Sequence, residues 1–217
     1  MGRIFIVDWS NRKHWQQQLE RHFRLRHEIY VVERRWQALA RPIDIEMDAF
    51  DTEHAIYLLA LDSSGAVIGG SRLIPTLHPH LLGDVFPQLA NGAPPRAPDI
   101  YEWTRFFIAI QNRIAGRSAR LAGEVLCGLL EASMQLGVRK ISVVCEAFWP
   151  DRLRALGWRV EILGESLRQE ECEIVGAIIE VSHAALEGTR HFYGVEGAVL
   201  HPPGVPPSFE ESQGLGA

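Results

Sequence analysis

Residues 99–110 read DIYEWTRFFIAI, the most apolar extended segment of this 217-residue chain. Their composition predicts a long central β-strand that carries an acid, Glu102, and a base, Arg105, among aromatic side chains. A carboxylate in such surroundings has a raised pKa and can accept a proton near neutrality, as a general base for an amine must. The alternative is a structural ion pair with arginine. Strict alternation places Glu102 and Arg105 on opposite faces of the sheet unless a bulge intervenes.

The flanking patterns predict an α/β fold, a mixed twisted sheet with helices on both faces. Before the central strand we expect a strand at 3–8, a helix at 11–35 and a β-hairpin of strands 55–62 and 66–74. An ordered loop follows at 76–98, anchored by Leu81, Leu82, Val85, Phe86 and Leu89. After the central strand we expect helices at 117–136, 150–156 and 182–192, and strands at 140–145, 158–163 and 172–181.

Chain length, net charge and the missing motifs limit the number of domains and the classes of function that the sequence allows. The length fits a single domain, placed at 1–201, before a flexible Pro/Gly-rich tail at 202–217. A net charge of −5 without a basic stripe argues against nucleic-acid binding, and the apolar runs are too short to span a membrane. Three scattered cysteines indicate reduced core thiols and a cytoplasmic protein. The histidines lack metal-ligand spacing and no G-x-S-x-G motif occurs, so we expect neither a metal site nor triad hydrolysis.

Charged residues also occur where burial is expected. Glu46, Asp48 and Asp51 alternate with large apolar side chains in 43–51, and any one of them alone could belong to a solvated acidic loop. Arg72 lies near the end of a half-buried strand, where a guanidinium needs a carboxylate partner, and Asp48 or Asp51 is the nearest in sequence. Arg26 falls on the apolar stripe of the first helix.

Two weaker patterns complete the candidate sites. Residues 113–118 lie between a strand and a helix, so Arg113, Gly116 and Arg117 can meet a phosphate, although glycines and exposed arginines are common in such turns. Aromatic residues gather around the middle strands, where most are expected to be core. These are Trp36, Trp103, Phe106, Phe107, Phe148 and Trp149.

Together these residues resemble the signature of the acyl-homoserine lactone synthases, which make quorum-sensing autoinducers. The similarity spans about residues 3–185 and rests on four motifs: LRHEIY at 25–30 with Trp36, EMDAFD at 46–51, SRLIPT at 71–76 and EWTRF at 102–106. Two features depart from the family pattern. Tyr30 replaces the usual Phe, and Trp103 with Thr104 replaces smaller residues, which suggests a reshaped acyl pocket.

The resemblance implies a fold like that of the GCN5-related N-acetyltransferases. It also implies a reaction in which the amine of S-adenosylmethionine attacks an acyl thioester, after which its carboxylate closes the lactone and releases methylthioadenosine. Both molecules are substrates, and no cofactor is expected. Acids and aromatic faces suit the sulfonium and ammonium groups, and arginines suit the carboxylate. The expected adenosylmethionine side comprises Arg26, Tyr30, Trp36, Asp48 and Asp51, with Arg72 and Arg105 bracing the acids or holding the carboxylate, and Glu102 as the base, directly or through water.

The acyl donor is expected to be acyl-CoA with a short or branched chain, as in a smaller branch of the family, rather than acyl carrier protein. Bulky side chains would shorten the pocket, namely Trp103, Phe107, Phe148 and Trp149. The residues Arg152, Arg154, Arg159 and Arg168 could instead form a patch for the acidic carrier protein. Cys145 stands where relatives that make 3-oxo products often carry Thr, and a thiol is a poor donor to that group, so we expect weak use of 3-oxo donors.

Two rival interpretations remain at this level. One is an N-acetyltransferase acting on another amine, because residues 113–118 partly mimic the pyrophosphate loop of that superfamily. The other is a non-catalytic sensor that binds adenosylmethionine or an acyl coenzyme.

Overall fold

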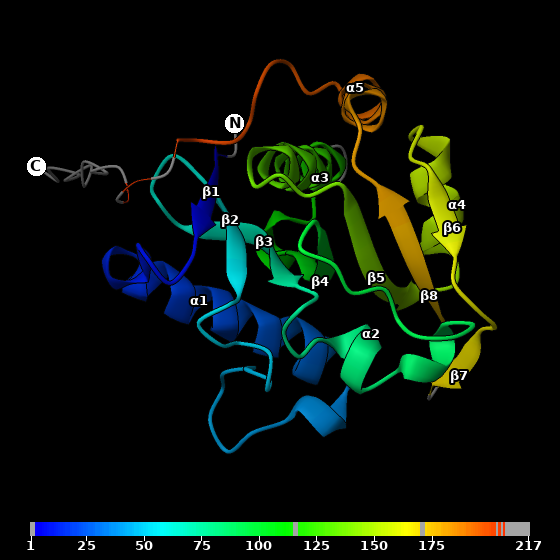
Figure 1. Cartoon of the computed structure of the whole chain (residues 1–217). Coiled ribbons are helices and arrows are strands. Elements are labelled where there is room, and N and C mark those ends of the chain that lie inside the picture. The colour runs from blue at the N-terminus through cyan, green and yellow to red at the C-terminus, as the bar shows by residue number, and fades with distance from the viewer. Residues whose placement is uncertain (1–2, 115–116, 170–171, 203, 205, 207–217) are drawn as a thin grey trace, which may run out of the picture.

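In the computed structural model, the described residues are 3–114, 117–169, 172–202, 204 and 206. Within them the chain forms one eight-stranded mixed sheet in the order β1-β2-β3-β4-β5-β8-β6, with β7 also paired to β8 (Figure 1). The strands are β1 (Arg3–Val7), β2 (Ile56–Leu61), β3 (Val67–Pro75), β4 (Ile100–Ile108), β5 (Lys140–Glu146), β6 (Val160–Ile162), β7 (Leu167–Gln169) and β8 (Cys172–Glu180). Neighbouring strands are antiparallel except β4 and β5, which are parallel.

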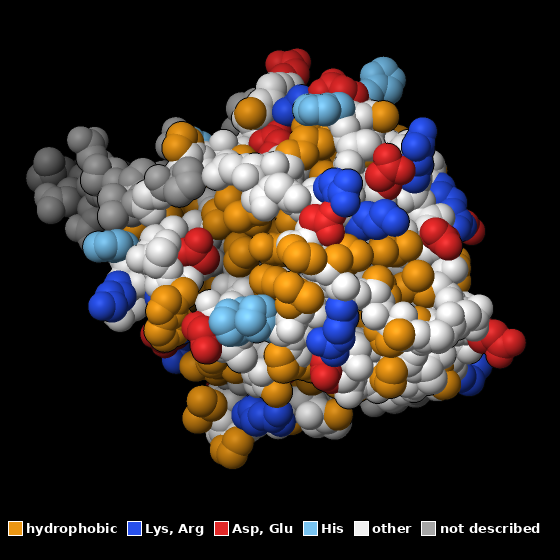
Figure 2. Space-filling model, in the orientation of Figure 1, with side chains coloured by type: hydrophobic (Ala, Val, Ile, Leu, Met, Phe, Trp, Pro, Cys, Tyr) orange, Lys and Arg blue, Asp and Glu red, His pale blue; other side chains and the backbone are white. Residues whose placement is uncertain are grey.

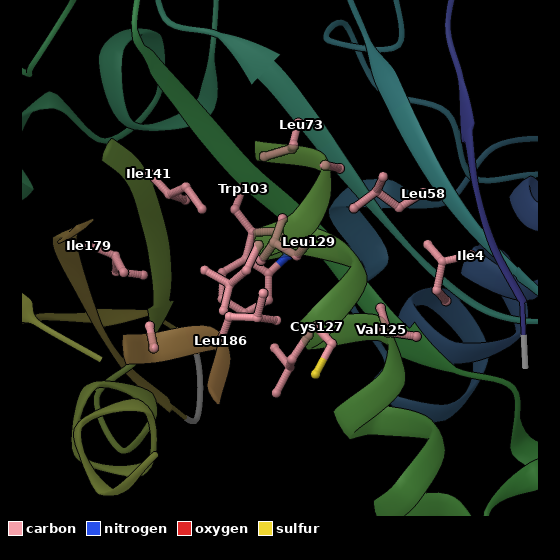
Figure 3. Close-up of a cluster of buried hydrophobic side chains, with 14 of the residues drawn as sticks. Ile4, Leu58, Leu73, Trp103, Val125, Cys127, Leu129, Ile141, Ile179 and Leu186 are labelled. Carbon is pink, nitrogen blue, oxygen red and sulfur yellow. The ribbon is translucent and has the colours of Figure 1, made fainter. Parts of the chain in front are cut away.

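Helices cover both faces of the sheet, as the sequence predicts. They are α1 (Gln16–Arg26), α2 (Leu81–Asp84), α3 (Arg117–Gln135), α4 (Trp149–Ala155) and α5 (His183–Tyr193). Apolar residues of α3, α4 and α5 pack on one face in a core cluster that contains Trp103 (Figure 3). Apolar residues of α1 pack on the opposite face. Because side chains alternate along a strand, Trp103 points to the α3 face while Glu102 reaches α2 on the other.

The sheet splits between β4 and β5. Their ladder runs from Ile100↔Lys140 to Trp103↔Val143, yet β4 continues to Ile108 and β5 to Glu146. Beyond Trp103 the two strands are not paired with each other. The gap opens in the middle of the molecule, between the helices of the two faces.

A β-bulge in β4 determines where Arg105 points. The β3–β4 register moves from Gly70↔Phe107 to Arg72↔Thr104, so β4 carries one residue more than β3 between these pairs. Arg105 adopts a left-handed φ of 56°, which is uncommon for a residue other than glycine. The bulge overrides strict alternation, and the Arg105 side chain meets the acids of 46–48 on the α1 and α2 face.

The helix predicted over 11–35 lies at the expected position, but it is not one continuous α-helix. A 3-10 turn at Arg12–His14 precedes α1, and Trp15 lies between them rather than inside a continuous helix. After Arg26 the backbone widens into a π-helical segment, His27–Glu33. A π-helical turn changes the angular spacing of side chains, which a period of 3.6 residues cannot anticipate.

Two further predictions need correction. The segment at 76–98 contains α2 and a 3-10 turn at Pro87–Leu89, and Val85 is 48% exposed, so it does not anchor the segment. Strand β7 was not predicted. Most of the predicted tail at 202–217 lies outside the described residues; within it, the Gly204 carbonyl accepts a hydrogen bond from Trp15 Nε1 (3.0 Å).

In the part of the chain that the structure describes, no helix has both the length and the hydropathy needed to cross a bilayer.

Close packing of α5 against the turn after α4 gives a stability prediction. A Cβ added at Gly188 would lie 2.1 Å from the carbonyl oxygen of Leu156, a backbone atom that cannot move cheaply. We expect Gly188→Ala to lower the free energy of unfolding by about 1–3 kcal/mol. Urea unfolding measures this, with Glu187→Ala on the exposed side of the same helix as the control. Equal stability of the two variants would contradict this packing.

Candidate active site

A cavity of about 620 Å³ occupies the split between β4 and β5. Its walls come from the π-helical segment and the residues after it, from 103–108 of β4, from 143–146 of β5, and from α3, α4 and β8. The lining includes charged side chains, Arg34, Arg105 and Glu146, and aromatic rings both on the π-helical side, with Tyr30 and Trp36, and at α4, with Trp149. The cavity is thus both charged and aromatic.

Three arginines and three carboxylates form a buried ion network, of which Arg105 lines the cavity. Arg26 binds Glu46 (2.6 Å) and Asp51 (2.8 and 2.9 Å). Arg72 contacts Asp48 and Asp51, both at 2.7 Å. Arg105 closes the chain of contacts through Glu46 (3.0 Å) and Asp48 (2.8 Å). The formal charges of these six groups cancel.

The sequence-based expectation that Arg72 pairs with Asp48 or Asp51 is confirmed for both acids. Additional donors complete the network, since Tyr57 Oη donates to Asp51 (3.0 Å) and Arg72 Nε donates to the hydroxyl of Thr104 (3.0 Å). A buried charge without such partners would be costly. The side chains of Arg26 and Arg72 are fully buried, so these two brace the acids, whereas Arg105 lines the cavity.

Neighbouring arginines keep two acids of the network, Glu46 and Asp51, ionised. Burial opposes the ionisation of Glu46, but Arg26 and Arg105 outweigh it and lower its pKa to about 2. Burial likewise opposes the ionisation of Asp51, and Arg26 and Arg72 hold its pKa well below the usual range. Glu46 and Asp51 are thus ionised at neutral pH.

An aromatic wall borders the network. Tyr30 and Trp36 stack with ring centroids 5.3 Å apart, and the Arg105 guanidinium lies 5.4 Å from the centre of the Tyr30 ring. The Tyr30 hydroxyl donates to the Phe106 carbonyl (2.9 Å), which ties the π-helical segment to the bulge. Both rings line the cavity, next to Arg105.

Glu102 is fully buried and makes contacts that the sequence did not reveal. Its two carboxylate oxygens accept the backbone N–H groups of Leu81 (2.7 Å) and Leu82 (2.6 Å) at the start of α2. Burial raises the pKa of Glu102 to about 7 despite these two hydrogen bonds. Among the described residues no arginine forms an ion pair with Glu102, although the nearby charge of Arg72 also lowers its pKa. Glu102 does not itself line the cavity.

The α4 end of the cavity is an aromatic box. Trp149 meets Phe106 edge-on at 5.7 Å and Trp103 at 6.4 Å between ring centroids. Phe107 is buried among the residues that pack on α1 and also contributes to the lining. Phe148, in contrast, is 47% exposed and does not line the cavity, because it lies at the start of α4 with Arg152 over its ring.

The expected phosphate site is only partly described. Arg113 lines the cavity, but it already binds Glu33 (2.7 Å) and the Ile108 carbonyl (2.9 Å). Gly116 and the side chain of Arg117 lie outside the described residues. A phosphate would have to compete with Glu33 for Arg113.

Several lining residues were missed or misjudged from sequence. Arg34 binds Glu146 (2.7 Å), and its guanidinium lies over the Trp36 ring. Nothing in the sequence indicated that either charged residue belongs to the site, because both stand among residues that are expected to be exposed. Phe106 was read as core. Cys172, expected to be a core thiol, is partly exposed and lines the cavity, as does Cys145, which the family resemblance places beside the acyl group. Burial raises the pKa of the Cys145 thiol to about 12.

The autoinducer synthase family profile matches residues 10–188. The chain belongs to this family. It is 36% identical over 186 residues to the isovaleryl-homoserine lactone synthase of Bradyrhizobium diazoefficiens, covering 85% of this chain and 82% of that protein. The resemblance drawn from the four sequence motifs is thereby confirmed. Acyl-homoserine lactone synthases are acyltransferases.

Two solved structures of autoinducer synthases superpose closely. The CoA-dependent acyl-homoserine lactone synthase MesI shares 56% identity at a TM-score of 0.85, covering 91% of this chain and 98% of that one. The CoA-dependent synthase BjaI, solved with SAM and isopentyl-CoA, shares 32% identity at a TM-score of 0.85, covering 93% of each chain. A putative N-acetyltransferase from Lactobacillus plantarum, 15% identical at a TM-score of 0.54 over 83% of this chain and 99% of that one, confirms the expected fold class alone.

The ion network gives this autoinducer synthase an acid-dependent stability. Because the pKa of Glu46 is lowered in the folded state, its contribution is fully present above the pKa of an unfolded Glu, near 4.3, and is lost as the pH falls toward 2. We expect Glu46→Gln to reduce the free energy of unfolding by about 3 kcal/mol at pH 7 and by roughly half as much at pH 3. Urea unfolding at both pH values measures this.

Glu161→Gln, at an exposed position of β6, is the control and should change stability little at either pH. A loss in Glu46→Gln that is the same at pH 7 and pH 3 would show that Glu46 is not held ionised by Arg26 and Arg105.

Proposed function

We propose that this chain is an acyl-homoserine lactone synthase that takes a short or branched acyl chain, such as isovaleryl, from acyl-CoA. The amine nitrogen of S-adenosylmethionine attacks the thioester carbonyl, the carbon–sulfur bond breaks and the coenzyme leaves as its thiol. The adenosylmethionine carboxylate then attacks the carbon attached to the sulfonium, which closes the lactone and releases methylthioadenosine. The observation that carries this proposal is the single cavity that joins the ion network to the aromatic box.

The polar end of the cavity suits adenosylmethionine. Tyr30 and Trp36 offer aromatic faces to a sulfonium, and Asp48, whose side chain is 12% exposed, offers a carboxylate to the ammonium. Arg105 can hold the substrate carboxylate. Arg26, Arg72 and Asp51 do not contact the substrate; they fix the positions of Asp48 and Arg105 through the ion pairs of the network. Because the formal charges of the network cancel, it can accept a substrate that carries both positive and negative groups.

Glu102 is the proposed base. Its raised pKa, near 7, matches a group that must take a proton from an ammonium or amine at neutral pH. Since Glu102 does not line the cavity, the proton reaches it through a water beside Thr104, which does line the cavity on the same face of β4. Both carboxylate oxygens keep lone pairs beyond the two amide contacts.

Transfer of the acyl group is direct. Cys145 is a nucleophile at the acyl end of the cavity, but the thiolate is the reactive form and the pKa of Cys145, near 12, keeps the thiol protonated. An acyl-cysteine intermediate is therefore disfavoured. Adenosylmethionine and the acyl thioester are both consumed, and the reaction needs no further cofactor. The absence of disulfides among the described cysteines fits a reducing compartment such as the cytoplasm.

Charge and similarity favour acyl-CoA over acyl carrier protein. On the face shown in Figure 2, Lys and Arg side chains are interspersed with acidic ones rather than joined into a basic patch. In the expected docking patch, Arg154 pairs with Asp151 (2.8 Å) and Arg159 with Glu180 (3.2 Å), so their charges are largely balanced. The CoA dependence of MesI and BjaI points the same way.

The base assignment predicts a pH profile. Glu102 accepts protons only when ionised, so kcat/KM should rise with pH around a midpoint near 7. We expect Glu102→Gln to lower kcat/KM about 10²- to 10⁴-fold and to remove this limb. Full turnover with an unchanged pH profile would exclude Glu102 as the base. Because the substitution also disturbs the amides of α2, thermal unfolding of the variant should be measured alongside, with Glu161→Gln as the control.

The donor proposal predicts which thioester is used. Initial rates of methylthioadenosine release should be far higher with isovaleryl-CoA than with isovaleryl-loaded acyl carrier protein. A large preference for the carrier protein would overturn the donor assignment and leave the synthase reaction standing. Thiol release without methylthioadenosine would indicate an N-acetyltransferase, and binding without either product would indicate a sensor.

A further inference from the structure

Ser71 lies at a junction that the reaction described above does not use. It is fully buried in β3, opposite the bulge of β4. Its hydroxyl accepts the indole N–H of Trp103 at 2.5 Å and donates to the Thr104 carbonyl at 3.3 Å. One hydroxyl thus joins the aromatic box to the segment that carries Arg105.

Trp103 is the side chain that this hydroxyl controls. The ring lines the cavity and is otherwise surrounded by apolar groups, in a cluster with Leu73, Leu129 and Ile141 (Figure 3). Its N–H is its single polar group, and indole can only donate. Ser71 Oγ accepts that hydrogen bond, so one orientation of the ring is strongly favoured over those that would bury the N–H unpaired.

The orientation of Trp103 sets the shape of the acyl end. Its ring meets Phe106 edge-on at 5.7 Å and Trp149 at 6.4 Å between centroids. A rotation of Trp103 would displace both neighbours and change the length and width of the space between them. Discrimination between acyl chains that differ by one or two methylenes depends on such small changes of shape.

We propose that Ser71 is a positioning residue that determines which acyl chain the cavity accepts, by fixing the Trp103 indole at the acyl end. This inference rests on the proposed synthase function, since it concerns the donor of that reaction. Ser71 itself touches no substrate. Its effect is transmitted through a hydrogen bond to a ring that lines the pocket.

The test compares donor preference in matched variants. Ser71→Ala removes the acceptor, and Ser71→Cys replaces it with a weak one at nearly constant volume, which protects the fold if Ser71→Ala is unstable. Methylthioadenosine release is measured with isovaleryl-CoA, hexanoyl-CoA and octanoyl-CoA. We expect the ratio of kcat/KM for isovaleryl-CoA over octanoyl-CoA to fall about tenfold in both variants, with the KM for adenosylmethionine unchanged.

A control and a double-mutant cycle isolate the hydrogen bond. Ser133→Ala removes another fully buried serine hydroxyl, bonded to the Leu129 carbonyl in α3, and should leave the ratio unchanged. In a Trp103→Phe background no indole N–H exists, so adding Ser71→Ala should change the ratio no further.

The outcomes separate the two proposals. If wild-type protein releases no methylthioadenosine with any donor, the synthase function fails. If the wild type is active but Ser71→Ala and Ser71→Cys keep its donor ratio, the positioning role is overturned. A variant that raises the KM for adenosylmethionine while keeping the donor ratio would likewise overturn it, and would assign Ser71 to supporting the bulge through Thr104.

Discussion

The alternation of three guanidinium groups with three carboxylates in the interior is the constraint on which the rest of the structure depends. Each arginine touches two acids, and the six charges come from α1, the segment 46–51, β3 and β4. Removing any one would leave a partner charged and desolvated, at a cost of about 3–5 kcal/mol. The network therefore holds four separate parts of the chain in register, and it positions Arg105 in the wall of the cavity, with the partly exposed Asp48 bound to it.

Backbone irregularities make that presentation possible. A regular β4 would turn Arg105 to the α3 face, into the apolar cluster around Trp103, and the bulge with its left-handed residue prevents this. A regular continuation of α1 would rotate Tyr30 and Arg34 differently, and the π-helical segment instead directs both at the cavity. Strained or widened backbone at a site is maintained only where surrounding contacts hold it, here the Tyr30 hydroxyl on the Phe106 carbonyl and the ion pairs of Arg105.

The order of strands and helices was predictable because hydrophobic periodicity reports burial directly, and the pairing of Arg72 was predictable because a buried guanidinium requires an acid. The partners of Glu102 were not, since they are backbone amides of a four-residue helix in a segment without periodicity. The pairing of Arg113 with Glu33 joins residues 80 positions apart and depends on how the π-helical segment faces the end of β4. Phe148 was expected to line the pocket and does not, because it precedes helix α4, which begins at Trp149. Phe106 was expected to be core and lines the cavity, because the bulge reorients β4. Composition reveals neither the helix start nor the bulge.

The split in the sheet also separates two halves of the molecule. Four residue pairs join β4 to β5, whereas β1–β4 and β5–β8 each retain their own complete ladders. Substitutions on β5 or β8 can thus change one wall of the cavity. The register of β1–β4 and the ion pairs formed by residues of β3 and β4 are then unchanged. A synthase built on this plan can therefore reshape its cavity through β5 and β8, in addition to substitutions on β4 around Trp103 and Phe106, while the arginine–carboxylate pairs are kept.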